Sequence, residues 1–179
     1  MLNNPTPRVD FVPADHGLVS WTYDPACIVT AQATPAAGTL YVVMLKIPQP
    51  TLVTAIVMMN TIAGSTLTAG QNFAALYDAS GNQVGVTADQ TTAWAAAAGT
   101  KDMPLTAPVT VSGPFCRVGF YANGSVLPSW RCGVGAAPGN VNIGAGAARS
   151  GVANTGLTTT PPATLGSISI GFPWWVGLR

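Results

Sequence analysis

The amino-acid sequence predicts an all-β fold, a jelly-roll-like β-sandwich with one short helix and a long glycine-rich loop. Three observations favour it: β-branched runs recur, turn residues separate them at short intervals, and helical periodicity is confined to one segment. A closed β-barrel is the competing all-β architecture. A chain of 179 residues suits one domain with its own core. We therefore expect an extended N-terminal arm over 1–12 and a single β-sandwich domain over 13–179.

The clearest strand signals are two β-branched runs that begin at Thr39 and Thr51. The link Pro48-Gln49-Pro50 between them is short, which favours two adjacent strands joined by a tight connection. A hairpin is expected at Ser80-Gly81-Asn82, because Gly and Asn accept the positive φ that such turns need. Asp78 is placed to bond the backbone amides of that turn.

Further strands are expected over 101–111 and 114–124 and in the C-terminal segment. The candidate inward-facing residues of these strands are Phe115, Val118 and Phe120, and the C-terminal segment alternates the apolar residues Leu165, Ile168 and Ile170. One helix is expected within 87–99, where Thr87 or Asp89 is the candidate cap and alanines favour the helix before Gly99 ends it.

The segment 133–160 is rich in Gly, Ala, Asn and Thr and has few large apolar residues. Ordering its backbone costs on the order of 1 kcal/mol per residue, more than its few apolar side chains offset within one subunit. We therefore expect a long loop held by intersubunit contacts. The candidate intersubunit residues are Val141, Ile143 and Arg149.

The charge pattern excludes several classes of function. Charged residues make up 7% of the chain, glutamate is absent, and the net charge is +1, so no basic stripe for nucleic acid is expected. The most apolar stretch is interrupted by Lys46 and two prolines, which argues against membrane insertion. The N-terminus lacks the apolar run of a signal peptide. So uncharged a surface favours a multimer within a larger assembly.

No residue pattern points to catalysis, a metal or a cofactor. Asp15 and His16 are adjacent, and neighbours on an extended chain point to opposite faces, so they make a poor catalytic pair. Asp15 or His16 is instead expected to tie loop backbone at the start of the first strand. The six aspartates suggest turn and cap positions rather than a glycosidase pair, and a single histidine gives no ligand set. We expect no enzyme, with no catalytic or metal-binding residue and no cofactor.

Cys27, Cys116 and Cys132 form an odd set without a C-x-x-C spacing. They are interpreted as small buried apolar residues in a reducing compartment, and Cys116 with Cys132 is the only pair retained as a candidate bridge.

The aromatic residues offer a binding hypothesis. Adjacent strand residues cannot both face one core, so one of Trp174 and Trp175 is expected to face a partner or a ligand. Exposed tryptophan rings would stack on sugars, and asparagines would supply polar contacts. The candidate ligand or partner contacts are Trp130, Trp174, Trp175, Asn123, Asn140 and Asn142.

The stretch TAGQNFAALYDASGNQVGVTADQTTAW (68–94), supported by PADHGL (13–18) and Pro-Ala-Thr (162–164), resembles a domain family of actinobacteriophage virion proteins. The resemblance extends from about residue 13 to the end of the chain. That family occurs in minor tail proteins and small structural proteins. The resemblance implies a lectin-like jelly-roll sandwich and transfers no catalytic residue to this chain.

Composition and resemblance together predict a non-enzymatic virion surface structural protein, a capsid decoration, minor capsid or minor tail protein. It would assemble in the bacterial cytoplasm as a homo-oligomer, with a trimer favoured, and bind other virion proteins. The candidate particle anchor in the arm is formed by Pro5, Pro7, Arg8 and Phe11. The alternative is a lectin-like module of the tail that adheres to a host-envelope glycan. Capsid and tail locations remain equally open.

Overall fold

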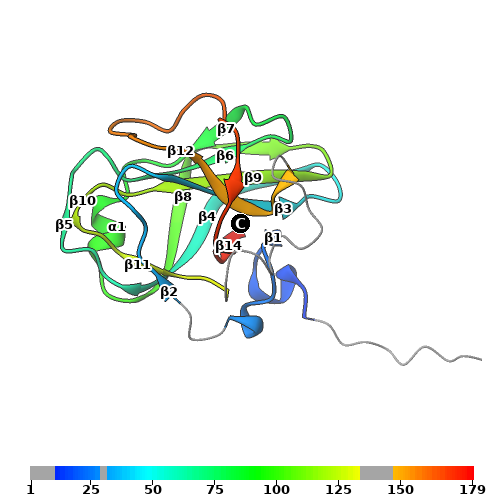
Figure 1. Cartoon of the computed structure of the whole chain (residues 1–179). Helices are drawn as coiled ribbons and strands as arrows, with labels where there is room; N and C mark the ends of the chain where they lie inside the picture. The colour runs from blue at the N-terminus through cyan, green and yellow to red at the C-terminus, as the bar shows by residue number, and fades with distance from the viewer. Residues whose placement is uncertain (1–10, 29–31, 134–146) are drawn as a thin grey trace, which may run out of the picture.

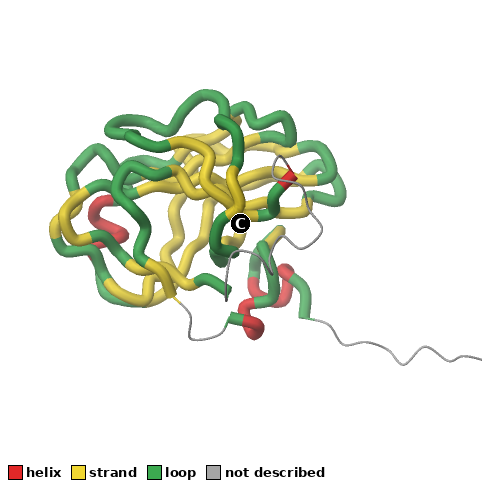
Figure 2. Tube along the Cα trace, viewed as in Figure 1, coloured by secondary structure: helices red, strands yellow, loops and turns green. Residues whose placement is uncertain are grey.

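The computed structural model describes residues 11–28, 32–133 and 147–179. Two six-stranded antiparallel sheets lie face to face, and a short helix sits at one end (Figures 1 and 2). This arrangement confirms the all-β class and the sandwich, whereas the jelly-roll connectivity stays a prediction. In the described part of the chain no helix is long and apolar enough to cross a membrane.

The first sheet contains β1 (Ser20–Trp21), β2 (Gln32–Ala33), β4 (Thr51–Ile62), β8 (Gly99–Val111), β11 (Ser129–Arg131) and β14 (Val176–Leu178). Their order is β1-β14-β4-β11-β2, and β8 pairs with the other side of β4. The long strand β4 therefore holds three partners. The outer edge of β8 carries Lys101, Pro104 and Pro108, residue types that discourage edge-to-edge aggregation.

The second sheet contains β3 (Leu40–Lys46), β6 (Phe73–Tyr77), β7 (Gln83–Val86), β9 (Phe115–Tyr121), β12 (Ser150–Asn154) and β13 (Ser169–Ile170). Their order is β13-β12-β3-β9-β6-β7. The expected hairpin is confirmed in β6–β7: Gly81 has φ 86°, and the Asp78 carboxylate accepts a hydrogen bond from the Asn82 amide at 2.9 Å. The remaining elements are a β5 (Thr66–Leu67)–β10 (Gly124–Val126) pair, the 3-10 turns η1 (Pro13–His16) and η2 (Pro25–Cys27), and α1 (Thr91–Ala95).

The expected pairing of the two β-branched runs is wrong. β3 pairs with β9 and β12 in the second sheet, and β4 belongs to the first. Pro48 and Pro50 carry no N–H group, so the link cannot continue a ladder of hydrogen bonds. The link instead carries the chain from one sheet to the other.

In strand β9 one of the three residues predicted to face the core faces outward instead. Cys116, Val118 and Phe120 face the core between the sheets, and the alternation of a strand then places Phe115 on the outer face. The expectation was therefore right for Val118 and Phe120 and wrong for Phe115. The guanidinium of Arg117, also on the outer face, lies over the Phe115 ring at 4.9 Å.

Four large rings fill one part of the core and are referred to as the aromatic cluster: Trp94, Phe120, Trp130 and Trp174. Trp130 contacts each of the other three edge-to-face, with ring centroids between 5.0 and 5.9 Å apart. The rings come from α1, β9, β11 and the segment before β14. The cluster therefore joins both sheets and the helix.

The helix is confirmed but shorter than expected, with five residues in Thr91–Ala95. Neither candidate cap is used. The Asp89 carboxylate accepts from the Asn72 amide at 3.0 Å, and the Thr87 backbone pairs with β8 at Leu105. Gln90 occupies the N-cap position without a side-chain cap, and burial of Trp94 in the aromatic cluster holds the helix instead.

The outer face of the second sheet is covered by residues 155–168, which we name the strap. Leu157, Leu165 and Ile168 pack on an apolar group that includes Leu40 and Tyr121. Of the alternating apolar residues in the C-terminal segment, Ile168 is buried and Leu165 is partly buried in this outer group, and Ile170 is exposed.

Hydrogen bonds hold the strap to the sheet. The Tyr77 hydroxyl donates to the Pro162 carbonyl at 3.1 Å, and the Gln83 amide donates to the Ala163 carbonyl at 2.8 Å.

Part of the glycine-rich segment, expected to be a loop throughout, is a strand. Residues Ser150–Asn154 form β12, which pairs with β3 and β13. A Cβ on Gly151 would meet the Ser169 carbonyl oxygen, so glycine is what permits β12 and β13 to approach so closely. Backbone pairing within the chain therefore orders this part, and Val141 and Ile143 lie outside the described residues.

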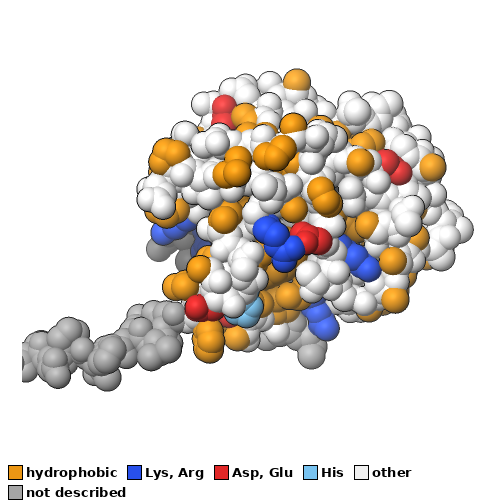
Figure 3. Space-filling model, turned by 180° about the vertical axis from the view of Figure 1, so that it is seen from behind, with side chains coloured by type: hydrophobic (Ala, Val, Ile, Leu, Met, Phe, Trp, Pro, Cys, Tyr) orange, Lys and Arg blue, Asp and Glu red, His pale blue; other side chains and the backbone are white. Residues whose placement is uncertain are grey.

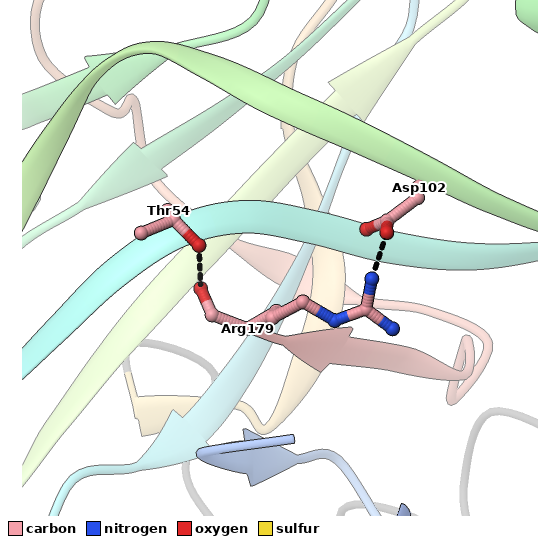
Figure 4. A network of polar contacts seen from close by, with 3 residues as sticks. All are labelled: Thr54, Asp102 and Arg179. Carbon is pink, nitrogen blue, oxygen red and sulfur yellow. Dashed lines mark hydrogen bonds and ion pairs between the residues drawn. The ribbon is translucent and has the colours of Figure 1, made fainter. Parts of the chain in front are cut away.

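The last residue of the sequence closes the first sheet. The Arg179 carbonyl oxygen accepts hydrogen bonds from the amides of Thr54 and Ala55 and from the Thr54 hydroxyl, where β4 has a bulge. Its guanidinium pairs with the Asp102 carboxylate on β8 (Figure 4). Both charged side chains are about half exposed, so water screens the ion pair and its contribution is small.

Two substitutions should show that the aromatic cluster contributes much more to the stability of the fold than this ion pair does. We expect Trp174→Ala to lower the free energy of unfolding by about 3–5 kcal/mol, because it leaves a cavity at a fully buried site. Asp102→Asn should cost less than about 1 kcal/mol. Urea unfolding followed by circular dichroism measures both, and equal losses would contradict the assigned roles.

Candidate functional site

The tryptophans predicted to stack on a ligand are structural. Trp130 and Trp174 are at most 1% exposed and belong to the aromatic cluster. A sugar-stacking platform needs an exposed ring face, so the prediction is wrong for these two residues. Their Nε1 groups have no hydrogen-bond partner, and the rings are held by contact with one another.

Trp175 faces the opposite side of the first sheet from Trp174, as strand geometry requires. Trp175 is nevertheless not an exposed contact for a partner or a ligand, because Leu18 and Tyr23 of the same chain pack around its ring. The Trp175 indole N–H donates to the Tyr23 carbonyl at 3.1 Å. The N-terminal segment 11–28 therefore covers this face.

Of the predicted polar contacts, Asn123 has an internal role. Its side-chain amide donates to the Leu157 carbonyl at 2.5 Å and so fixes the strap, and its backbone amide donates to Asn72. The predicted contacts and anchors that lie outside the described residues are Asn140, Asn142, Pro5, Pro7 and Arg8. Phe11 is described and is 62% exposed.

Asp15, one of the two residues expected to tie loop backbone, has that structural role. The Asp15 carboxylate accepts from the Val12 amide at 2.8 Å and closes the η1 turn. The His16 ring packs edge-to-face between Phe11 and Trp21, at centroid distances of 6.4 and 5.3 Å. Among the described residues no three His, Cys, Asp or Glu side chains gather where they could hold a metal ion.

Two hollows beside the N-terminal segment share lining residues, and we name them together the groove. Their volumes are about 290 and 560 Å³, and Thr22, Met44 and Arg149 line both. One wall is the N-terminal segment, and the other is β3 with residues 147–150. Trp174 reaches the inner end of the groove from the core.

The groove is cationic and apolar. Lys46 and Arg149 line it, and no carboxylate does so among the described residues. Arg149, expected at a subunit interface, donates from Nη2 to the Thr22 carbonyl of its own chain at 3.3 Å. The Tyr23 hydroxyl donates to the Pro173 carbonyl at 2.9 Å, and burial, with smaller effects of Cys132 and Cys27, raises the pKa of that hydroxyl.

This lining suits binding more than chemistry. Trp21, Met44 and Pro13 offer apolar contact, and the two cations at its side attract negative charge. Trp21 is not among the contacts predicted from the sequence, so the sequence analysis missed the groove. Ring size alone cannot distinguish a fully buried residue from one at the margin, because that depends on which strand lies beside it.

Comparisons with known proteins do not assign the chain to a family. No protein-family model matches the chain, and no curated protein matches it.

All three cysteines are free thiols, so the candidate Cys116–Cys132 bridge is absent. Cys116 and Cys132 are buried, as expected, whereas Cys27 is exposed and lines the groove. Burial raises the pKa of the Cys116 thiol to about 12 and also raises that of Cys132, where the nearby Arg131 opposes the effect only in part.

Thiol labelling tests this placement. One thiol per folded chain, Cys27, should react with a disulfide reagent at pH 8, and all three should react after unfolding in urea. Cys27→Ser should abolish the native reaction, because the raised pKa values keep Cys116 and Cys132 protonated and their burial excludes the reagent. Fast native labelling of Cys27→Ser would contradict the burial of the other two.

Proposed function

We propose that this chain is a non-enzymatic structural protein of a bacteriophage virion, a capsid decoration, minor capsid or minor tail protein. It docks on the particle as a homo-oligomer, with a trimer favoured, through the groove and the adjoining N-terminal segment. The resemblance of residues 68–94 to actinobacteriophage virion proteins supplies the class of particle. The surface beside the groove supplies the mode of docking.

The observation that carries the proposal is an apolar surface continuous with the groove. Phe11, Val12 and Val19 are exposed, and Val19 lines the groove itself. Phe11 contacts His16, which contacts Trp21 on the groove wall. Apolar side chains that gather around a recess are typical of protein-binding sites.

The composition of the rest of the surface also favours a protein that is part of a larger assembly. Hydrophobic side chains are scattered over the face seen in Figure 3, and charged side chains there are few. With only thirteen Asp, Lys and Arg residues in the whole chain, solvation depends on neutral polar groups. The groove, with Lys46 and Arg149 and no described carboxylate, fits an extended segment of a partner virion protein that carries apolar and acidic side chains.

Charge insertion tests the docking surface. Phe11→Asp and Val19→Asp should each weaken binding to particles that lack this protein by about 10-fold or more, because each places a carboxylate where an apolar contact is lost. Val126→Asp is the matched control: Val126 is 48% exposed, between the values of Val19 (41%) and Phe11 (62%), but it lies on β10, at the other end of the sandwich (Figure 1). Co-sedimentation measures binding, and equal retention of all three variants would refute the proposed surface.

The alternative function, adhesion to a host-envelope glycan, has one observation in its favour. Trp21 is only half-buried and lines the groove, so it is the tryptophan placed to stack on a sugar ring. If the alternative holds, glycan-array binding should be lost in Trp21→Ala and kept in Trp21→Phe. Particle binding by Trp21→Ala with no glycan bound by the native chain would leave the structural function alone.

A further inference from the structure

A buried arginine on the outer face of the second sheet has no anionic partner among the described residues. Arg117 is 7% exposed, its Nη1 donates to the Ala79 carbonyl at 3.2 Å, and its Cζ lies over Phe115. Its Nε is buried without any hydrogen-bond partner. Removing a cation from water without a counter-ion is costly, so the site is short of one negative charge.

No carboxylate in the described part of the chain supplies that charge. Asp78 directly follows Tyr77, which pairs with Arg117 across β6 and β9, but its oxygens are used within the hairpin turn, where they accept from the Asn82 amide and side chain. Desolvation alone would raise the pKa of Asp78, but the hydrogen bonds from Asn82, Ser80 and Gly81 outweigh it and lower the pKa. Burial lowers the pKa of Arg117, and no acid offsets that effect.

The guanidinium lines a hollow of about 430 Å³, a volume in the range of small-molecule sites. The hairpin turn 79–81 forms one side, and the end of the strap, 165–168, forms the other. Ser80 and Ser167 bring hydroxyl groups to the hollow, while Leu165 and Ile168 bring apolar surface. None of these residues belongs to the groove.

We propose that this hollow binds the carboxylate of a hydroxylated organic acid, such as a sugar acid, with Arg117 as its counter-ion and the two serines as partners of its hydroxyl groups. This inference is independent of the proposed virion function.

The charge and the lining select this ligand class. One guanidinium balances one negative charge, and no second cation lines the hollow among the described residues, so a monoanionic carboxylate fits better than a phosphate dianion. Serine hydroxyls both donate and accept, which suits ligand hydroxyl groups, and the two apolar side chains suit a carbon skeleton. The same chemistry can come from a free hydroxy acid or from an acidic unit of a polysaccharide.

Titration of the full chain with D-glucuronate, followed by the ¹⁵N resonance of the Arg117 Nε–H group, tests the proposal. A saturable shift is expected with D-glucuronate, a weaker one with acetate, and none with glucose. Stronger competition by phosphate than by glucuronate would overturn the carboxylate assignment. If a short polyglucuronate binds more tightly than D-glucuronate, the natural ligand is an acidic polymer. If the two bind equally, it is the free acid.

Variants make the result specific to the hollow. Arg117→Gln should reduce glucuronate affinity at least 10-fold, and Lys101→Gln, which removes an equal charge on β8, should leave it unchanged. Ser167→Glu keeps Arg117 and changes an exposed position, so it should fold and block glucuronate by offering its own carboxylate, while Ser167→Gln should not. Full binding by Ser167→Glu, or no shift of the native chain at ~50 mM glucuronate, a concentration well above a millimolar Kd, would overturn the proposal.

Discussion

Edge-to-face contact in the aromatic cluster is the interaction on which the rest of the structure depends. Trp130 touches the other three rings, and these rings reach it from both sheets and from α1. The indole N–H groups of all three tryptophans lack hydrogen-bond partners, so cohesion there comes from ring contact and burial. Sheet spacing, helix position and the path of the C-terminal segment all follow from this packing.

A second constraint is that both sheets are apolar on their outer faces as well. The N-terminal segment covers the first sheet around Trp175, and the strap covers the second around Leu40 and Tyr121. Hydrogen bonds to backbone carbonyls hold each cover to its sheet. Burial on two faces explains how a chain with so few charges folds around a high apolar content.

The two candidate binding sites lie where these covers end. The groove opens between the N-terminal segment and β3, and the hollow over Arg117 opens between the strap and the hairpin turn. Each covering segment leaves a recess where it ends. The outward-facing side chains of the neighbouring strands then line that recess. In β9 and β3 these include Arg117 and Lys46.

The sequence by itself determined the local features: the β-rich class, the 80–82 hairpin, the helix near Trp94, and burial of Val118 and Phe120. These follow from turn chemistry and side-chain alternation, which act over a few residues. Only the tertiary structure decided that β3 and β4 lie in different sheets, that Trp130 and Trp174 are core, and that Arg117 is buried without a partner. Such outcomes depend on which distant strand lies alongside, and local periodicity carries no information about that choice.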